Sequence, residues 1–437
     1  MDGLDLGIGY FGDRRRAARG LQMLERASAR KSLRITDLSD TRAEEIGFHR
    51  FLDSPQVSWP EILETAGRRT GAACQGRRVL AIQDTTEINF AGRAAGRRGL
   101  GPAGDGESPG FFLHPTVAVD RDQATLLGVV GAHIWSRPAR TRESERWLDS
   151  LHTAAERLAE ARSIVAVSDR EGDIYRQFAH RPAEVDLVVR IAQDRKLVDG
   201  GGLYTAARAW PELDRIEAGV PAHRPADSAR TATLAVRAGR VRLRRPRKAA
   251  RGEPAELGMT LVELAEVDPP EGRTPVIWRL LTTLPADTAA QAREVAEIYR
   301  LRWRIEQVFR ALKRDGLGLD DVQMQARERL FKLAALGLVA AARTLQLVDA
   351  RAGSDRPAAD VLDPGLIDAV AAIGRTFEGA TKPQQNPFEH GSLAWLSWIV
   401  ARMGGWKGYY RSPGPKTMAK GWDRLAEQLN GYLKANP

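Results

Sequence analysis

Hydrophobic and polar residues follow different patterns in successive parts of this 437-residue chain. Residues 1–70 have a helical pattern. From about residue 78 short β-rich runs take over, and one helical stretch (144–162) precedes the last of them. This alternation predicts a mixed α/β fold. The runs are Val79–Gln83, Thr116–Asp120, Ala124–Val130 and Ile164–Ser168.

The second half of the chain changes pattern twice more. Residues 185–285 are strand-like, with glycine and proline between the runs, and the pattern after Pro285 is helical through Leu347. A break rich in Pro, Gly and Asp follows, and then another helical segment. We therefore expect a helical domain over 1–70, an α/β domain over 71–345 with a β-rich insertion at about 185–285, and a helical domain over 346–437.

The charge balance is basic, with 66 Lys and Arg against 56 Asp and Glu and a pI of about 9.9. Only ten of the basic residues are lysines. Arginine holds phosphate through a planar fork and stacks on bases, so this composition fits a nucleic-acid partner. Many basic proteins bind no nucleic acid, however, and an arginine bias also follows from a GC-rich genome.

The chain shows few signs of secretion or membrane insertion. Cys74 is the single cysteine, which excludes an intramolecular disulfide and a thiolate metal cluster. The acidic start MDGLDLGIGY does not have the pattern of a secretory signal. In the least polar stretch, Leu330–Leu347, Lys332 and Arg343 leave an uncharged run of ten residues, about half of what a bilayer crossing needs. We expect a soluble cytoplasmic protein without a membrane partner.

Two apolar runs end in aspartate. VLAIQD ends at Asp84 and is followed by two threonines, and SIVAVSD ends at Asp169 and is followed by Arg-Glu-Gly-Asp. An aspartate after a buried strand often caps the next turn or helix. If the two strands are neighbours, however, their carboxylates form a hard-oxygen site suited to Mg²⁺ or Mn²⁺. The residues alone leave both interpretations open.

The segment Ile298–Arg314 combines acid, base and aromatic side chains. If it is one helix, four of its polar residues fall within a sector of about 60° beside an apolar sector. These four are Tyr299, Arg302, Glu306 and Lys313. Such a stripe either faces a site or belongs to a solvated helix with spaced salt bridges. Trp303 and five arginines between residues 300 and 314 are less typical of a plain solvated face.

At these residues the chain resembles a known family. The spacing Tyr-x2-Arg-x3-Glu-x6-Lys is similar to the YREK signature of bacterial insertion-sequence transposases. The strand followed by DTT at Asp84 and the strand followed by DREGD at Asp169 resemble that family's first and second acidic motifs. The resemblance extends over nearly the whole chain, including Gly110 through His114 and Ala401 through Trp406.

The resemblance implies an α/β fold with a ribonuclease H-like catalytic core. It implies that Asp84, Asp169 and Glu306 are the catalytic residues of a DDE enzyme with two Mg²⁺ ions, for which Mn²⁺ is expected to substitute. Asp84 would bridge both ions, Asp169 would hold one and Glu306 the other. The flanking helical domains would bind the transposon ends (1–70) and dimerise (346–437).

The resemblance also implies DNA-binding residues. Arg302 and Lys313 would hold phosphates, and Tyr299 would bond a phosphate or sugar through its hydroxyl. Trp278, 21 residues before Tyr299, would stack on a flipped base; the alternative is a buried strand tryptophan.

Two basic stretches complete the predicted DNA-binding surface. Arg14 and Arg15 lie in the segment that resembles the end-binding domain. The basic tract Arg240–Arg251, with Arg244 and Arg245, would clamp the DNA end.

The implied activity is cut-and-paste transposition. Water first nicks each end, and the freed 3′-OH attacks the opposite strand and forms a hairpin. A second water opens the hairpin, and the 3′-OH then attacks target DNA. The expected partners are double-stranded DNA, both terminal inverted repeats and target, and a second copy of the chain in a paired-end homodimer at the bacterial nucleoid. Two alternatives remain: a two-metal endonuclease without strand transfer, and a catalytically silent DNA-binding remnant or regulator.

Overall fold

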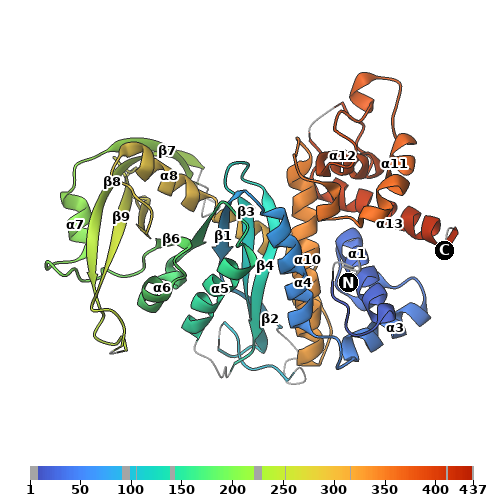
Figure 1. Cartoon of the computed structure of the whole chain (residues 1–437), viewed down its shortest axis with the longest axis horizontal. Helices are drawn as coiled ribbons and strands as arrows, with labels where there is room; N and C mark the ends of the chain where they lie inside the picture. Colours follow the sequence, from blue (N-terminus) through green and yellow to red (C-terminus); the bar gives the residue numbers. More distant parts are fainter. Residues whose placement is uncertain are drawn as a thin grey trace.

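The structure is a computed structural model of the chain. It describes residues 8–90, 99–104, 106–137, 143–220, 229–250, 252–314, 316–409 and 412–435, with the backbone alone at 415 and 430–435. The outer ends of the two predicted terminal domains and Arg251 of the basic tract lie outside the described residues. A large sheet fills one side of the molecule, and helices from both ends of the chain fill the other (Figure 1). The predicted mixed α/β class is confirmed.

Among the described residues, ten strands form one continuous sheet. Its order is β2-β3-β1-β5-β6-β10-β9-β8-β7, and β4 pairs with the free side of β3. The strands are β1 (Arg78–Gln83), β2 (Thr86–Asn89), β3 (Gly110–Asp120), β4 (Leu126–Trp135), β5 (Ser163–Ser168), β6 (Val185–Arg190), β7 (Asp214–Val220), β8 (Arg230–Arg244), β9 (Glu256–Glu266) and β10 (Ile277–Thr282).

The inner half of the sheet is buried on both faces. β1, β5 and β6 are parallel neighbours, and β3 runs antiparallel to β1 and β4. Along β1, Leu80 and Ile82 belong to the hydrophobic core under the later helices, whereas Val79 and Ala81 belong to the core on the other face. Because both faces are covered, these strands are continuous apolar runs without polar alternation. Helices α5 (Glu143–Arg157) and α6 (Tyr175–His180) contribute to the second core.

The outer half extends the same sheet with antiparallel strands. β10 pairs with β6 on one side and β9 on the other, and β8 and β7 follow in register. In β7 and in the last third of β8, buried and exposed positions alternate, which is typical of strands with one solvated face. The short helix α7 (Leu203–Ala209) lies against β8 and β9.

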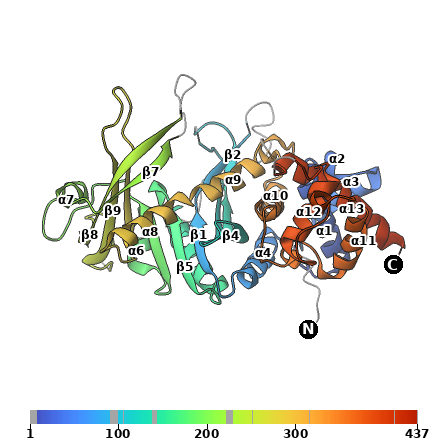
Figure 2. The ribbon, with the colours of Figure 1, turned by 90° about the horizontal axis from the view of Figure 1, so that it is seen from above.

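Helices α8 (Ala289–Arg300) and α9 (Trp303–Leu312) run in line across the sheet (Figure 2). The prediction of one helix over Ile298–Arg314 was wrong in detail. Hydrogen bonds between residues three apart, such as Arg302 N to Tyr299 O at 3.0 Å, tighten the chain between α8 and α9. Lys313 follows α9 with an extended ψ of −161°, so the helix ends before the predicted stripe does.

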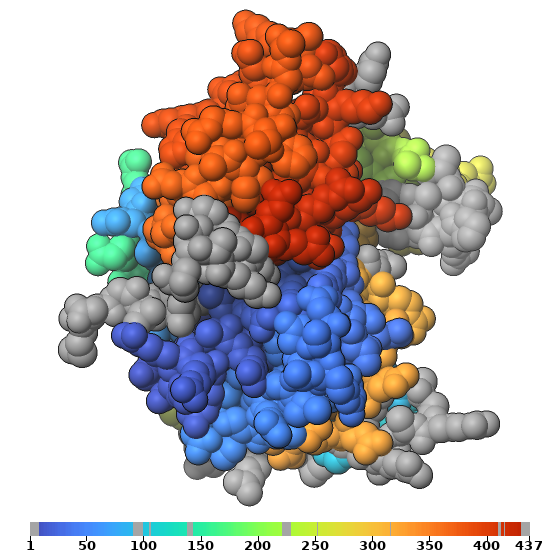
Figure 3. Space-filling model, turned by 90° about the vertical axis from the view of Figure 1, so that its right-hand side faces the viewer, coloured from blue at the N-terminus to red at the C-terminus, as the bar shows by residue number. Residues whose placement is uncertain are grey.

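The N-terminal and C-terminal helices lie side by side (Figure 3). Asp13, Thr41 and Ser58 cap the starts of three of them by accepting backbone N–H bonds. The helices are α1 (Arg14–Arg30), α2 (Ile35–Leu38), α3 (Arg42–Asp53), α4 (Trp59–Ala73), α11 (Ile367–Arg375), α12 (Leu393–Met403) and α13 (Pro415–Ala435), with 3₁₀ turns at Leu319–Asp321, Ala358–Asp360, Pro364–Leu366 and Lys382–Gln384.

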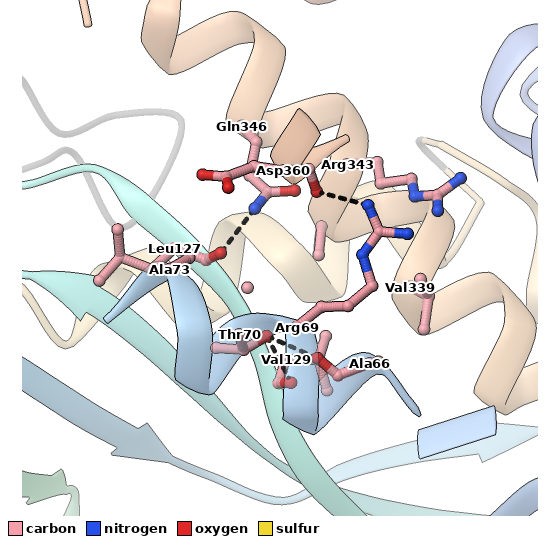
Figure 4. A pocket seen from close by; sticks show the side chains of 12 residues that line it. Ala66, Arg69, Thr70, Ala73, Leu127, Val129, Val339, Arg343, Gln346 and Asp360 are labelled. Carbon is pink, nitrogen blue, oxygen red and sulfur yellow. Dashed lines mark hydrogen bonds between the residues drawn. The ribbon is translucent and has the colours of Figure 1, made fainter. Parts of the chain in front are cut away.

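Helix α10 (Arg327–Ala350) joins the sheet to these terminal helices. It is the one helix among the described residues that is long and apolar enough to cross a membrane, but 83% of its most apolar window is buried inside the protein. Figure 4 shows a small pocket where α10, α4 and β4 meet. There Gln346 donates to the Leu127 carbonyl at 2.6 Å and Thr70 to the Val129 carbonyl at 2.8 Å, so polar bonds fasten α10 and α4 to the sheet.

Candidate active site

Asp84 lies at a break between two strands. β1 ends at Gln83 and β2 begins at Thr86, and both pair with β3. The side chain of Asp84 is 10% exposed, and its Oδ1 accepts a hydrogen bond from the Thr85 amide at 2.8 Å. The break therefore turns one carboxylate out of the sheet ladder while keeping it buried.

Asp169 lies at the same edge of the sheet. β1 and β5 are parallel and pair Ile82 with Val167, so each aspartate follows its strand by the same number of residues. Asp169 also caps the 3₁₀ turn Arg170–Gly172, because its Oδ1 accepts from the Glu171 amide at 2.9 Å. Asp169 therefore fits both interpretations of the sequence, because it caps the following turn and also lies at the same edge of the sheet as Asp84.

Glu306 approaches from the first turn of α9. Arg302 donates from Nη1 to Asp84 Oδ2 at 2.9 Å and from Nη2 to Glu306 Oε1 at 3.3 Å. One guanidinium therefore joins two carboxylates that are more than 200 residues apart in the chain. Arg302 is 9% exposed, whereas the Glu306 side chain is 35% exposed.

The carboxylates influence one another strongly. The pKa of Asp84 is raised to about 7, mainly by burial and also by the charges of Asp169 and Glu306, while the charge of Arg302 and the Thr85 amide oppose the shift. Like charges in a buried site disfavour ionisation, and a cation placed among them favours it. The site is thus a cluster of acids that gains from added positive charge.

The donor set suits a hard divalent cation, because all three groups are carboxylates. Within the described ranges, no three His, Cys, Asp or Glu side chains are arranged as a metal-binding group. The Arg302 guanidinium lies between Asp84 and Glu306 and pairs with both. As carboxylates at one edge of the sheet, Asp84 and Asp169 fit such a cation in chemistry and position, and Glu306 faces Arg302 from α9.

A cavity of about 1040 Å³ opens next to the carboxylates. Trp278 of β10 and Tyr299 of α8 meet there edge to face, with ring centroids 5.5 Å apart. Trp278 is half-buried and lines the cavity, so it is not a fully buried strand tryptophan. Trp303 lines the same cavity and is 52% exposed. Two tryptophan rings are therefore accessible to a planar ligand, and the buried Tyr299 ring packs behind Trp278.

The cavity wall is cationic. Its arginines come from the turn after β5, from β6 and β10, and from α8 and its junction with α9. They are Arg170, Arg190, Arg279, Arg300 and Arg302. Burial raises the pKa of the Tyr299 hydroxyl, and a hydrogen bond with Arg190 opposes this shift. The arrangement suits an anion that also carries flat rings.

Lys313 lies beyond the end of α9, with its side chain half-buried. Burial lowers the pKa of Lys313, while the carboxylates of Asp320, Glu87 and Glu306 oppose the shift. The structure therefore places this lysine in the electrostatic surroundings of Glu306, although not on the predicted helix face.

The remaining predicted DNA-binding residues are not brought to the carboxylates. Arg14 and Arg15 are exposed in the first turn of α1, on the far side of α10 from β1 (Figure 1). Arg244 is exposed at the end of β8. Arg245 donates to the Glu253 carbonyl at 2.7 Å, so its guanidinium braces the β8–β9 connection.

The sequence interpretation missed two residues near the site. Arg190 is the last residue of β6, the third parallel strand, and Asp84 and Asp169 directly follow the other two parallel strands. Its position at the end of an apolar strand could therefore have identified Arg190 as a site residue. His114 makes hydrogen bonds to both neighbours of Asp84, but a single histidine within an apolar strand gives no such indication.

Comparisons with known proteins give a family match and a similar solved structure. Residues 75–343 match the family model described as a transposase DDE domain, a span that contains all three acids. A solved structure of the piggyBac transposase, in a synaptic complex with hairpin DNA, is similar with a TM-score of 0.44 and 8% sequence identity. That match covers 96% of this chain and 72% of the other.

Proposed function

The chain belongs to the DDE transposase family, and on that premise we propose that it cuts the ends of a transposable element and joins them to target DNA. The observation that carries the proposal is the double contact of Arg302 with Asp84 and Glu306, beside Asp169 on the adjacent parallel strand. Arg302, which contacts two of these acids, also lines an arginine-rich cavity of about 1040 Å³.

We propose that Asp84, Asp169 and Glu306 hold two Mg²⁺ ions, with Mn²⁺ able to substitute. When bound, such ions supply an activated water and neutralise the leaving oxygen in phosphodiester cleavage. Arg302, released from the two carboxylates, would hold a nonbridging phosphate oxygen together with Lys313. Asp84, whose pKa is raised to about 7, would become fully ionised as positive charge enters the site.

The cavity residues would handle the DNA end. Stacking of a base on Trp278 contributes about 1–3 kcal/mol, which offsets the few kcal/mol that flipping a base costs. Tyr299 would donate its hydroxyl to a phosphate or sugar. These contacts are consistent with a hairpin intermediate, in which the end of the duplex is strongly distorted.

The proposal extends to the core and the assembly. The order β4-β3-β1-β5-β6, with β3 antiparallel to its neighbours, supports a ribonuclease H-like core. The expected insertion at about residues 185–285 would consist of β7–β9, with β6 and β10 at its borders. We assign end binding to residues 1–70 with Arg14 and Arg15, clamping of DNA to Arg244, and dimerisation to residues 346–437. A YREK-type bacterial element acting at the nucleoid is the expected setting.

A strand-transfer assay tests the proposal. The purified protein would be incubated with Mg²⁺, a target plasmid, and DNA that ends in the inverted repeats flanking its gene. We expect hairpinned ends and then joined products from the same molecules. Cutting without joining would favour an endonuclease, and specific binding without cutting would favour a silent regulator.

A further inference from the structure

The buried histidine of β3 touches both neighbours of Asp84. His114 Nδ1 lies 2.9 Å from Thr85 Oγ1, and His114 Nε2 lies 3.2 Å from Gln83 Oε1. His114 is 1% exposed, so water does not compete for these bonds. One imidazole thus bridges the residue before Asp84 and the residue after it.

The bridge spans a gap in the strand pairing. Gln83 pairs with Thr116 and Thr86 with Leu113, which leaves Asp84 and Thr85 opposite Pro115 and His114. Proline has no backbone N–H, so it cannot donate a ladder bond to this gap. The side chain of His114 supplies local hydrogen bonds where the backbone ladder lacks them.

The ring is held in one protonation state and one orientation. Burial, with smaller contributions from His133 and Arg146, lowers the pKa of His114 to about 3, so the imidazole is neutral. Gln83 Oε1 can only accept, which places the proton on Nε2 and leaves Nδ1 to accept from the Thr85 hydroxyl. The Trp147 ring packs against the imidazole with centroids 4.4 Å apart.

We infer that His114 is a positioning residue that acts through Thr85 and Gln83 to fix the direction of the Asp84 carboxylate. The Thr85 amide already holds Asp84 Oδ1, so a Thr85 side chain anchored to His114 fixes both the backbone and the carboxylate. This inference rests on the proposed function, in which Asp84 holds the metal. Partners of this kind, one bond beyond the ligand, typically change metal affinity or activity by about 10–100-fold.

Matched variants test the bridge. Thr85→Val removes the hydroxyl at nearly constant shape, and Thr85→Ser keeps it. His114→Phe removes both ring nitrogens. His133→Phe is the control, because His133 pairs with His114 across β3 and β4 and none of its described contacts reaches Gln83 or Thr85. Mn²⁺ binding to the full-length protein would be measured by calorimetry, nicking by single-turnover kinetics, and folding by the melting temperature.

We expect Thr85→Val and His114→Phe to weaken Mn²⁺ binding about tenfold or more and to slow nicking, while Thr85→Ser and His133→Phe stay close to wild type. Thr85→Val is the decisive variant if His114→Phe fails to fold. The inference would be overturned if Thr85→Val bound Mn²⁺ as tightly as wild type, or if Thr85→Ser lost as much Mn²⁺ affinity as Thr85→Val. Neither result would contradict the proposed function. Wild-type protein that binds Mn²⁺ but never cuts DNA would instead overturn the proposed function, and the calorimetry would still test the bridge. No Mn²⁺ binding by the wild type would overturn both.

Discussion

The two halves of the ten-stranded sheet differ in how they are buried and in what they present. The inner strands β1, β3 and β5 are buried at nearly every position, and β1 and β5 end at the carboxylates Asp84 and Asp169. At the end of β8, in the outer half, Arg240, Arg242 and Arg244 are exposed while Val241 and Leu243 are buried. Covering both faces fixes a strand on two sides, whereas a solvated face leaves every second position free to carry charge.

This difference indicates a division of labour. In-line chemistry at phosphorus needs groups placed to a fraction of an ångström, and the doubly covered half provides that rigidity. In the proposed function a long DNA ligand needs charge spread over area, and the solvated faces of β7 and of the last third of β8 would provide it. Arg240 and Arg242 pair with Asp287 and Asp199 on the surface, so DNA would replace these acids rather than meet bare cations.

Substitutions at adjacent positions of β1 and of β8 should give the largest contrast between the two halves of the sheet. Leu80→Ala in β1 and Leu243→Ala in β8 remove buried side chains and should each lower the free energy of unfolding by about 2–5 kcal/mol. Their neighbours should differ: Val79→Thr buries a hydroxyl at a cost of about 1–3 kcal/mol, whereas Arg242→Ala loses only exposed, solvent-screened ion pairs and should leave the free energy of unfolding nearly unchanged. Denaturant titration measures all four. If Val79→Thr and Arg242→Ala lowered the free energy of unfolding equally, β1 and the end of β8 would not differ in burial as described.

Trp278→Ala should affect one step more than another. Loss of base stacking of about 1–3 kcal/mol predicts roughly 10–100-fold slower hairpin formation with a smaller change in the first nick. Single-turnover kinetics on end-containing DNA separate the two steps. If both steps slow equally, Trp278 supports the fold of the cavity and does not hold a base.

The acid stability of the inner half should depend on His114. Its pKa is lowered in the folded chain to about 3 from the usual 6.5, so the folded state binds fewer protons between these values. The resulting contribution to the free energy of unfolding is complete above about pH 6.5 and is lost as the pH falls toward 3. The difference in melting temperature between wild type and His114→Phe should therefore narrow from pH 7 to pH 5. A constant difference would show that the imidazole does not stay neutral.

The smallest effect concerns the helices outside the sheet. Arg14→Ala combined with Arg15→Ala should weaken end binding and reduce its salt dependence by up to about two units of slope. Arg244→Ala at the tip of β8 is the matched change in the outer half. If Arg244→Ala reduces the salt dependence of end binding and the double variant of Arg14 and Arg15 leaves it unchanged, the end-binding surface lies on the sheet.

Much of the fold could be predicted from the pattern of residues. The apolar runs that end at Asp84 and Asp169 are the buried parallel strands β1 and β5, since burial on both faces requires uninterrupted apolar sequence. The helical pattern around Glu306 was detected as well. Its break at Leu301 and Arg302 was not, because helical periodicity is almost unchanged by one tightened turn.

The contacts that complete the site were beyond sequence interpretation. Arg302 bridges Asp84 and Glu306, and His114 bridges Gln83 and Thr85, only because strands and helices distant in sequence pack together. Arg245 shows another contact that the sequence does not reveal. It is predicted to bind DNA from the charge of its tract, and in the structure its guanidinium also donates to the Glu253 carbonyl of the β8–β9 connection.

The most direct test compares wild type with Glu306→Gln on DNA carrying the element's ends, with Mg²⁺ present. Glutamine keeps the shape of Glu306 and its acceptor for Arg302 but removes the charge that would hold a metal. We expect Glu306→Gln to bind the ends as tightly as wild type. Nicking should slow by about a thousandfold or more, which corresponds to roughly 4 kcal/mol of lost transition-state stabilisation. Nicking at the wild-type rate, or loss of end binding together with nicking, would contradict a catalytic role for the site that Asp84, Asp169 and Glu306 form.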